Sequence, residues 1–176
     1  MKHLIIAALA WLAGVSGAAA EVVSATPDRT ELRFSAAFDA SPAEVWRAIG
    51  RVDRWWNGEH SYSGEARRLR LDLAAPGCFC ERWAGGSIEH MRVVMAVPGQ
   101  TLRLTGGLGP LQANALNGVM TFTLEPVGAG ARLTLTYVIA GQRADGLEAL
   151  APLVDQVIGE QFGRLASFAR TGDPAP

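Results

Sequence analysis

The sequence has little basic charge that could gather on one surface. Its 176 residues include a single lysine, Lys2, against fifteen arginines, and the formal net charge is −1. The arginines are scattered along the chain, whereas a nucleic-acid-binding protein shows a basic patch or stripe. We therefore expect no nucleic-acid partner.

Several catalytic signatures are also missing. The chain contains no G-x-S-x-G, no H-E-x-x-H, no P-loop and no G-x-G-x-x-G before a helix. Only three histidines are present, and His3 lies in the segment that we interpret below as an export signal. A histidine-rich metal site is excluded for this reason, and we expect neither a metal nor a cofactor.

Cysteine is scarce, and its two occurrences, Cys78 and Cys80, are separated by one residue. On a strand, positions i and i+2 lie on the same face, roughly 6.5–7 Å apart. That distance is at the limit of what a disulfide spans without strain. Pairing is open to an exported protein, but the spacing favours two neighbouring buried thiols. A metal site would need a further ligand, for which His90 is the only candidate.

The hydrophobic share of 49% is unevenly distributed. A short positive segment ending at His3 precedes an apolar run, Leu4–Val15, and small residues follow at 18–20. These are the three parts of a secretory signal peptide, and the run is shorter than the ~20 residues of a membrane span. We predict a signal peptide over residues 1–20, cleaved after Ala20, with no stable membrane insertion afterwards. The protein is then periplasmic or secreted; the alternative is an N-terminal core helix or an uncleaved anchor.

The remaining chain reads as one domain over residues 30–170, between a flexible N-terminal tail (21–29) and a C-terminal tail (171–176). Ser41-Pro42-Ala43-Glu44 has the pattern of a capping box, and predicts a short helix that ends near Gly50. A second short helix is expected over Val52–Trp56. Period-two alternation between proline- and glycine-containing turns predicts strands. They cover Leu32–Phe38, Leu69–Leu73, Cys78–Trp83, Ile88–Val97, Leu102–Leu104, Met120–Leu124 and Leu133–Ile139.

One long amphipathic helix closes the chain, with apolar residues every three to four positions from Leu147 to Phe168. An apolar sheet face must be covered, and this is the only long helix available to cover it. We predict an α+β fold, in which a curved antiparallel sheet of six to seven strands wraps around the C-terminal helix. A helix about 10 Å wide cannot fill such a concave face. The order of elements therefore predicts a pocket.

Three stretches resemble the SRPBCC superfamily, the START-like group with a helix-grip fold. They are Phe38–Ile49 followed by Trp55-Trp56, Gly77–Trp83 with Val93–Leu104, and Leu124–Pro126 with Arg132–Tyr137. The resemblance extends over about residues 30–170, and the group includes polyketide cyclases and homologues of the activator of heat-shock ATPase. It implies a deep hydrophobic cavity but no particular catalytic residue. The expected signal peptide differs from the cytosolic members and argues against a chaperone-activator role.

Glu81 is the first candidate for chemistry. Alternation places it on the same strand face as Phe79 and Trp83. If this face lines the cavity, burial raises the pKa of Glu81 and makes it a candidate general acid or base. The alternative is an ion pair at the sheet surface with Arg92 or Arg103.

Two histidines are weaker candidates. His90 alternates with Arg92 and Val94, while Met91 begins the more aliphatic row, so His90 is expected to face outward or lie at a rim unless a β-bulge shifts the register. His60 follows the tryptophan pair, where such a fold has its cavity mouth, and could titrate near neutral pH.

The leading hypothesis is an exported protein that binds a small hydrophobic or amphipathic ligand in an internal cavity, without a cofactor. One alternative is a polyketide cyclase- or dehydratase-like enzyme using Glu81 and a histidine; another is a protein-interaction module whose cavity is filled by its own side chains. The sequence does not specify the ligand or the oligomeric state. The expected ligand-binding residues are Trp56, Phe79, Glu81, Trp83, Met91, Val93, Leu104, Met120, Phe122, Leu135, Tyr137, Val157, Gln161 and Phe162.

Overall fold

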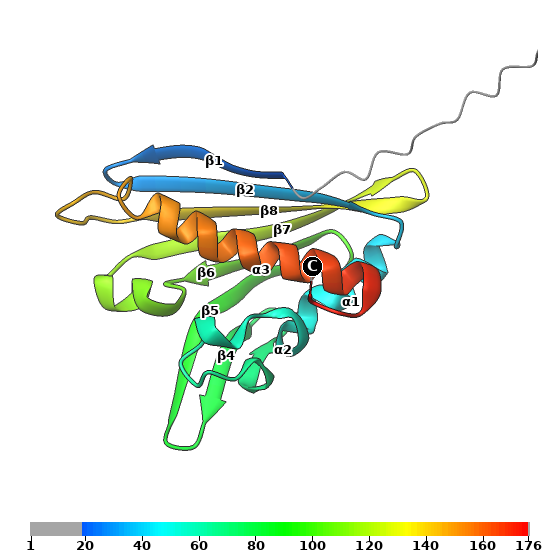
Figure 1. The fold of residues 1–176 in the computed structure, drawn as a ribbon, viewed down its shortest axis with the longest axis horizontal. Coiled ribbons are helices and arrows are strands. Elements are labelled where there is room, and N and C mark those ends of the chain that lie inside the picture. The colour runs from blue at the N-terminus through cyan, green and yellow to red at the C-terminus, as the bar shows by residue number, and fades with distance from the viewer. Residues whose placement is uncertain (1–18, 176) are drawn as a thin grey trace, which may run out of the picture.

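An eight-stranded antiparallel sheet curves around one long helix in the computed structural model, which describes residues 19–175 (Figure 1). The strands are β1 (Ala19–Thr26), β2 (Arg29–Phe38), β3 (Leu69–Leu71), β4 (Gly77–Trp83), β5 (Gly86–Val97), β6 (Thr101–Gly106), β7 (Asn117–Val127) and β8 (Gly130–Ala140). The helices are α1 (Pro42–Gly50), α2 (Val52–Trp55) and α3 (Ala151–Thr171), with 3₁₀ turns η1 (Gly58–His60), η2 (Ala66–Arg68) and η3 (Gly109–Asn114). The predicted α+β helix-grip architecture is confirmed.

The sheet order is β1-β2-β8-β7-β6-β5-β4-β3. Strands β3 to β8 therefore form a meander, and β2 joins it by pairing with β8, from Arg29 opposite Ala140 to Phe38 opposite Ala131. Helix α3 crosses the concave side of this sheet (Figure 1). The short helices α1 and α2 lie against the same side, in contact with α3.

The additional strand is β1, which pairs with β2 at the sheet edge. The prediction of a flexible tail over residues 21–29 is therefore wrong, because residues 21–26 belong to this strand. Residues 22–29 are all exposed. Because neither face of this strand is buried, its sequence shows no alternation of apolar and polar residues from which a strand could be predicted. Of the predicted export segment, residues 1–18 lie outside the described residues, and Ala19 and Ala20 begin β1.

The predicted capping box fixes the start of α1. The backbone N–H of Ser41 donates to the Glu44 carboxylate (2.8 Å), and the Glu44 N–H donates to the Ser41 hydroxyl (3.4 Å). These contacts satisfy N–H groups that a helix start leaves unpaired. The helix then buries Val45, Trp46 and Ile49 against the sheet and α3.

The two cysteines form a disulfide, so the expectation of free thiols is wrong. The Sγ atoms of Cys78 and Cys80 are 2.00 Å apart, and their Cα atoms are 5.4 Å apart. That Cα separation is shorter than an ideal strand gives between positions i and i+2 and lies within the range for a disulfide. The pairing with β5 shifts register between Phe79 and Cys80, so the strand is irregular at this point.

Two glycines inside α3 differ in what surrounds them. A Cβ at Gly159 would lie 3.3 Å from the ring of Phe34, whereas a Cβ at Gly163 would meet nothing within 4 Å. Close packing therefore accounts for Gly159 only.

Replacing Gly163 with alanine is expected to raise the free energy of unfolding by about 0.5–1 kcal/mol, because alanine costs less backbone entropy in a helix. The matched control is Gly159→Ala, for which contact with Phe34 offsets part of the same gain. Urea denaturation of the two variants measures both values. A loss of stability in Gly163→Ala would contradict the open surroundings of that residue.

Candidate functional site

A cavity of about 510 Å³ lies beside the N-terminal part of α3. Its walls come from the loop after α2, from β5 and β8, and from the segment around η3. The residues that line it are Trp56, Glu59, His60, Ser61, Tyr62, His90, Leu108, Gly109, Pro110, Leu111, Tyr137, Leu150, Leu153, Val154, Val157 and Ile158. The cavity thus occupies one end of the sheet–helix interface.

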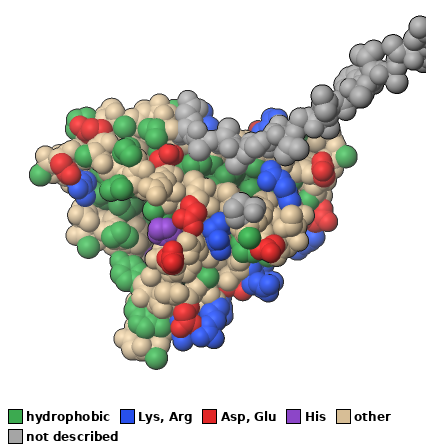
Figure 2. All heavy atoms as spheres, viewed as in Figure 1, with side chains coloured by type: hydrophobic (Ala, Val, Ile, Leu, Met, Phe, Trp, Pro, Cys, Tyr) green, Lys and Arg blue, Asp and Glu red, His purple; other side chains and the backbone are tan. Residues whose placement is uncertain are grey.

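Exposed apolar side chains are found at the entrance. Tyr62 and Leu153 are 54% and 62% exposed, while the interior residues Trp56, Tyr137 and Ile158 are buried. On the face shown in Figure 2, hydrophobic side chains gather on the half of the molecule where α3 begins. An apolar molecule therefore meets a similar surface outside and inside the cavity.

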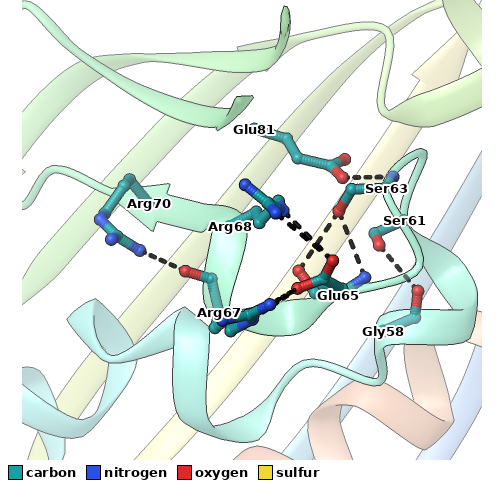
Figure 3. A network of polar contacts seen from close by, with 8 residues as sticks. All are labelled: Gly58, Ser61, Ser63, Glu65, Arg67, Arg68, Arg70 and Glu81. Carbon is teal, nitrogen blue, oxygen red and sulfur yellow. Dashed lines mark hydrogen bonds and ion pairs between the residues drawn. The ribbon is translucent and has the colours of Figure 1, made fainter. Parts of the chain in front are cut away.

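Glu81 lies behind the cavity wall and is fully buried. Its carboxylate accepts hydrogen bonds from the backbone N–H groups of Tyr62 (3.0 Å) and Ser63 (2.6 Å), as the contact with Ser63 in Figure 3 shows. Burial raises the pKa of Glu81, but the hydrogen bonds from Ser63, Tyr62 and His90 outweigh it and hold the pKa below its usual value. The carboxylate is therefore ionised at neutral pH.

Neither arrangement expected for Glu81 is present. It pairs with no arginine, because Arg92 contacts Glu89 and Arg103 contacts Thr121. It does not itself line the cavity, and its pKa is lowered rather than raised. The sequence contains no signal for the backbone N–H groups that hold it.

His90 is the partner of Glu81, with Nε2 3.2 Å from the carboxylate. The side chain is 4% exposed and lines the cavity, so the expected outward orientation is wrong. In the β4–β5 ladder, Phe79 pairs with Met91 and Cys80 with Glu89, which leaves His90 as an extra residue. This β-bulge turns His90 and Met91 to the same side, which is the exception that the alternation argument allowed.

Burial lowers the pKa of His90, and the attraction of Glu81 raises it by less. A buried imidazole that is neutral in the folded protein must take up a proton when the chain unfolds in mild acid.

Both lowered pKa values make the protein less stable in acid. A group with a depressed pKa in the folded state stabilises fully above its unfolded pKa and loses that contribution as the pH falls. For His90 the loss begins below about pH 6.5, and for Glu81 below about pH 4.3. Thermal unfolding measured from neutral to acidic pH should show the loss, and His90→Gln should flatten the upper part of the curve. A wild-type melting temperature that rises between neutral pH and pH ~5 would contradict the His90 assignment, and one that rises below pH ~4 would contradict that of Glu81.

Aromatic rings enclose the Glu81–His90 pair. The ring centroids of Phe79 and Tyr62 lie 5.0 and 6.0 Å from that of His90. Tyr62 also stacks on Trp83 at 6.5 Å, and Trp56 meets Phe79 edge-on at 5.1 Å. The hydrogen bond between the neutral imidazole and Glu81 is therefore surrounded by aromatic rings, and both side chains are buried.

A second set of polar contacts fastens the loop after α2 to α3. Glu160 accepts from the Asn57 side chain (2.7 Å) and pairs with His60 (3.1 Å), and the Gln161 side chain accepts from the Asn57 N–H (2.7 Å). His60 thus lies at the cavity, as expected. Glu160 was not predicted, since an exposed glutamate on a helix carries no distinguishing sequence signal.

Within the same loop, Figure 3 shows how the chain beyond η1 is held. The Ser61 hydroxyl donates to the Gly58 carbonyl (2.7 Å), and the Glu65 N–H donates to the Ser63 hydroxyl (3.2 Å). Glu65 pairs in turn with Arg67 and Arg68. The loop is therefore a structured part of the cavity wall.

Of the fourteen expected ligand-binding residues, the structure places three on the cavity wall: Trp56, Tyr137 and Val157. Glu81 lies one side chain behind the wall, and half-buried Trp83 packs on Tyr62. The others are buried in the core and do not line the cavity, namely Phe79, Met91, Val93, Leu104, Met120, Phe122, Leu135, Gln161 and Phe162. Gln161 and Phe162 belong to α3 itself, and Phe79 packs behind the wall residues Trp56 and His90.

Besides Glu59, Ser61 and Tyr62 in the loop after α2, the wall residues that sequence analysis missed come from two segments. One is the start of α3, from Leu150 to Ile158, and the other is the apolar stretch Leu108–Leu111 around η3. The segment Leu108–Leu111 could have been found from the sequence, because an apolar loop between two strands indicates a buried or ligand-binding surface.

No group of three or more His, Cys, Asp or Glu side chains among residues 19–175 is placed to hold a metal ion. Within that range, no helix is long and apolar enough to span a membrane.

A curved antiparallel sheet around one long helix, with an apolar cavity between them, defines the helix-grip class of the SRPBCC superfamily. The chain belongs to the family described as polyketide cyclase / dehydrase and lipid transport, which it matches over residues 29–169. A search of the curated proteins found no match.

Solved structures share the fold at low sequence identity. CalU16 from Micromonospora echinospora is 16% identical, with a TM-score of 0.56 over 89% of this chain and 87% of that one. Conserved protein EF2215 from Enterococcus faecalis is 15% identical, with a TM-score of 0.57 over 90% and 80%. DynU16, a protein in the dynemicin biosynthetic locus, is 19% identical, with a TM-score of 0.58 over 82% of this chain and 48% of DynU16.

Proposed function

We propose that this protein binds a small hydrophobic or amphipathic ligand in the cavity beside α3. The observation that carries the proposal is the cavity itself, about 510 Å³ in volume and lined largely by Leu, Val, Ile, Trp and Tyr side chains. Ligand sites are typically such apolar hollows with a few placed polar groups. Burial of apolar surface contributes roughly 25 cal/mol per Å². The family description, which includes lipid transport, agrees with this function.

The alternative of a cavity filled by its own side chains does not fit these residues, because the hollow between α3 and the sheet is open.

We also propose that the protein acts outside the cytoplasm. The support is the pattern of residues 1–20, with its positive start, apolar run and small residues before Glu21. The N-terminal sequence of protein recovered from a periplasmic fraction tests this, and a chain that still begins at Met1 would contradict it.

Native mass spectrometry of the purified protein tests ligand binding. We expect an added mass that is retained under native conditions and released on denaturation. Titration with the apolar fluorophore anilinonaphthalene sulfonate, before and after removal of that ligand, gives an independent measurement. A protein that carries no added mass and takes up no fluorophore does not have this function.

A second candidate function is proton transfer on a bound substrate, as in a cyclase or dehydratase. The buried Glu81–His90 pair favours it, because a carboxylate that orients a neutral imidazole makes His90 a general base. The molecule recovered from the protein can be returned to fresh wild-type protein and to His90→Gln. Conversion by the wild type alone, for example by loss of water, supports an enzyme, and an unchanged mass in both contradicts it.

A further inference from the structure

The hydrogen bonds of His90 determine which of its ring nitrogens is an acceptor. Glu81 already accepts two backbone N–H groups, so its carboxylate can only accept from His90 Nε2. A neutral imidazole with its proton on Nε2 has a bare Nδ1. This Nδ1 is buried and has no hydrogen-bond partner among the described residues. The cavity wall therefore contains an acceptor that needs a donor.

Tyr137 supplies the complementary group. It is fully buried on β8 and lines the same cavity. The Leu108 backbone approaches its hydroxyl oxygen, but no group among residues 19–175 accepts the phenol proton. Burial raises the pKa of Tyr137, so the phenol keeps its proton. A buried hydroxyl without an acceptor has lost its hydrogen bond to water without replacement, which is unfavourable. The wall therefore also contains a donor that needs an acceptor.

Two paired glycines lie between these groups. A Cβ at Gly118 would come within 2.9 Å of the Tyr137 hydroxyl, and a Cβ at Gly106 within 3.1 Å of the His90 carbonyl. Gly106 and Gly118 are opposite each other on β6 and β7. Neighbouring strands are about 4.8 Å apart, and β5 and β8, which carry His90 and Tyr137, are roughly three strand spacings apart with β6 and β7 between them. No side chain from these two positions fills the sheet surface between them.

The wall also indicates the charge of the ligand. None of the lining residues is Lys or Arg, and Glu59 and the ionised Glu81 behind His90 supply negative charge. An anion would be repelled and would leave Nδ1 without a donor. A neutral ligand avoids both costs.

We propose that the ligand is a neutral, apolar molecule with two separate oxygen groups, a hydroxyl that donates to His90 Nδ1 and an oxygen that accepts from the Tyr137 hydroxyl. This inference rests on the proposed ligand-binding function and specifies its ligand class. His90 and Tyr137 determine specificity, and Glu81 positions His90.

A series of naphthalenes tests the proposal on the wild-type protein by fluorescence titration. The probe 6-methoxy-2-naphthol carries a donor at one end and an acceptor at the other. Replacing its hydroxyl, in 2,6-dimethoxynaphthalene, or deleting its methoxy group, in 2-naphthol, should each weaken binding about tenfold, the value of one neutral hydrogen bond. The anion 6-methoxy-2-naphthoate should bind more weakly still.

Two variants assign the preferences to residues. Tyr137→Phe keeps the ring and should abolish the advantage of 6-methoxy-2-naphthol over 2-naphthol. His90→Gln keeps a donor for Glu81 but lacks Nδ1. It should therefore abolish the tighter binding of 6-methoxy-2-naphthol relative to 2,6-dimethoxynaphthalene. Two results would overturn the proposed ligand class: equal binding of all four naphthalenes by the wild type, as when a water molecule satisfies both groups, or tighter binding of the anion. Either result leaves the binding function itself intact. Failure of every probe, together with no co-purified ligand, overturns both.

Discussion

Replacing Glu81 with alanine is expected to lower the free energy of unfolding by about 3–5 kcal/mol. The side chain is fully buried and joins three donors, the N–H groups of Tyr62 and Ser63 and Nε2 of His90. Removing one member of a buried charged network leaves the others desolvated and unpaired, a loss of this size. Chemical denaturation monitored by tryptophan fluorescence measures it.

Glu89→Ala is the matched control, since Glu89 lies on β5 close to the same network but pairs with Arg92 at the surface, at 2.7 Å. An exposed pair of this kind should change stability by less than about 0.5 kcal/mol. Similar losses in the two variants would show that Glu81 does not hold the loop and His90 together. Recovery in Glu81→Gln should be partial, because an amide cannot accept from all three donors.

Replacing Val157 with tryptophan is expected to weaken ligand binding more than tenfold with little loss of stability. Val157 is half-buried on α3 and forms part of the cavity wall, so a larger side chain there has the hollow to enter. The indole takes up volume and apolar surface that the ligand would otherwise occupy. Contact with one large apolar side chain contributes about 1.5–3 kcal/mol, which corresponds to tenfold or more in affinity.

The control for this variant is Gln156→Trp, which adds the same side chain at the exposed neighbouring position of α3. It should bind the probe with wild-type affinity. Titration with 6-methoxy-2-naphthol and thermal unfolding of both variants separate loss of binding from loss of folding. Wild-type affinity in a folded Val157→Trp would place the ligand elsewhere.

The fold could be predicted from the sequence because its signals are local. Alternation in Leu32–Phe38 and Leu133–Ile139 marks strands, and Ser41 with Glu44 marks a helix start. Strand β1 escaped prediction because its described side chains are exposed, and main-chain pairing with β2 leaves no apolar pattern.

The site was harder to predict, because its features depend on contacts between distant residues. The bulge at His90 arises from the pairing of β5 with β4 and reverses what alternation indicates for that residue. Which end of α3 leaves the sheet uncovered depends on how the helix crosses it. Sequence periodicity therefore identified Tyr137 and Val157 on apolar faces but gave the same standing to Phe122 and Phe162, which are buried in the core and do not line the cavity.

The pairing of β2 with β8 has a consequence for how the chain acquires its structure. It joins Arg29–Phe38 to Gly130–Ala140, so the β1–β2 hairpin lacks its second neighbour until β8 has been synthesised. Closing a sheet between such distant segments is slow compared with forming hairpins. During synthesis the open edge of β2 therefore stays without its final hydrogen bonds, and the sheet closes only when the C-terminal third of the chain is available.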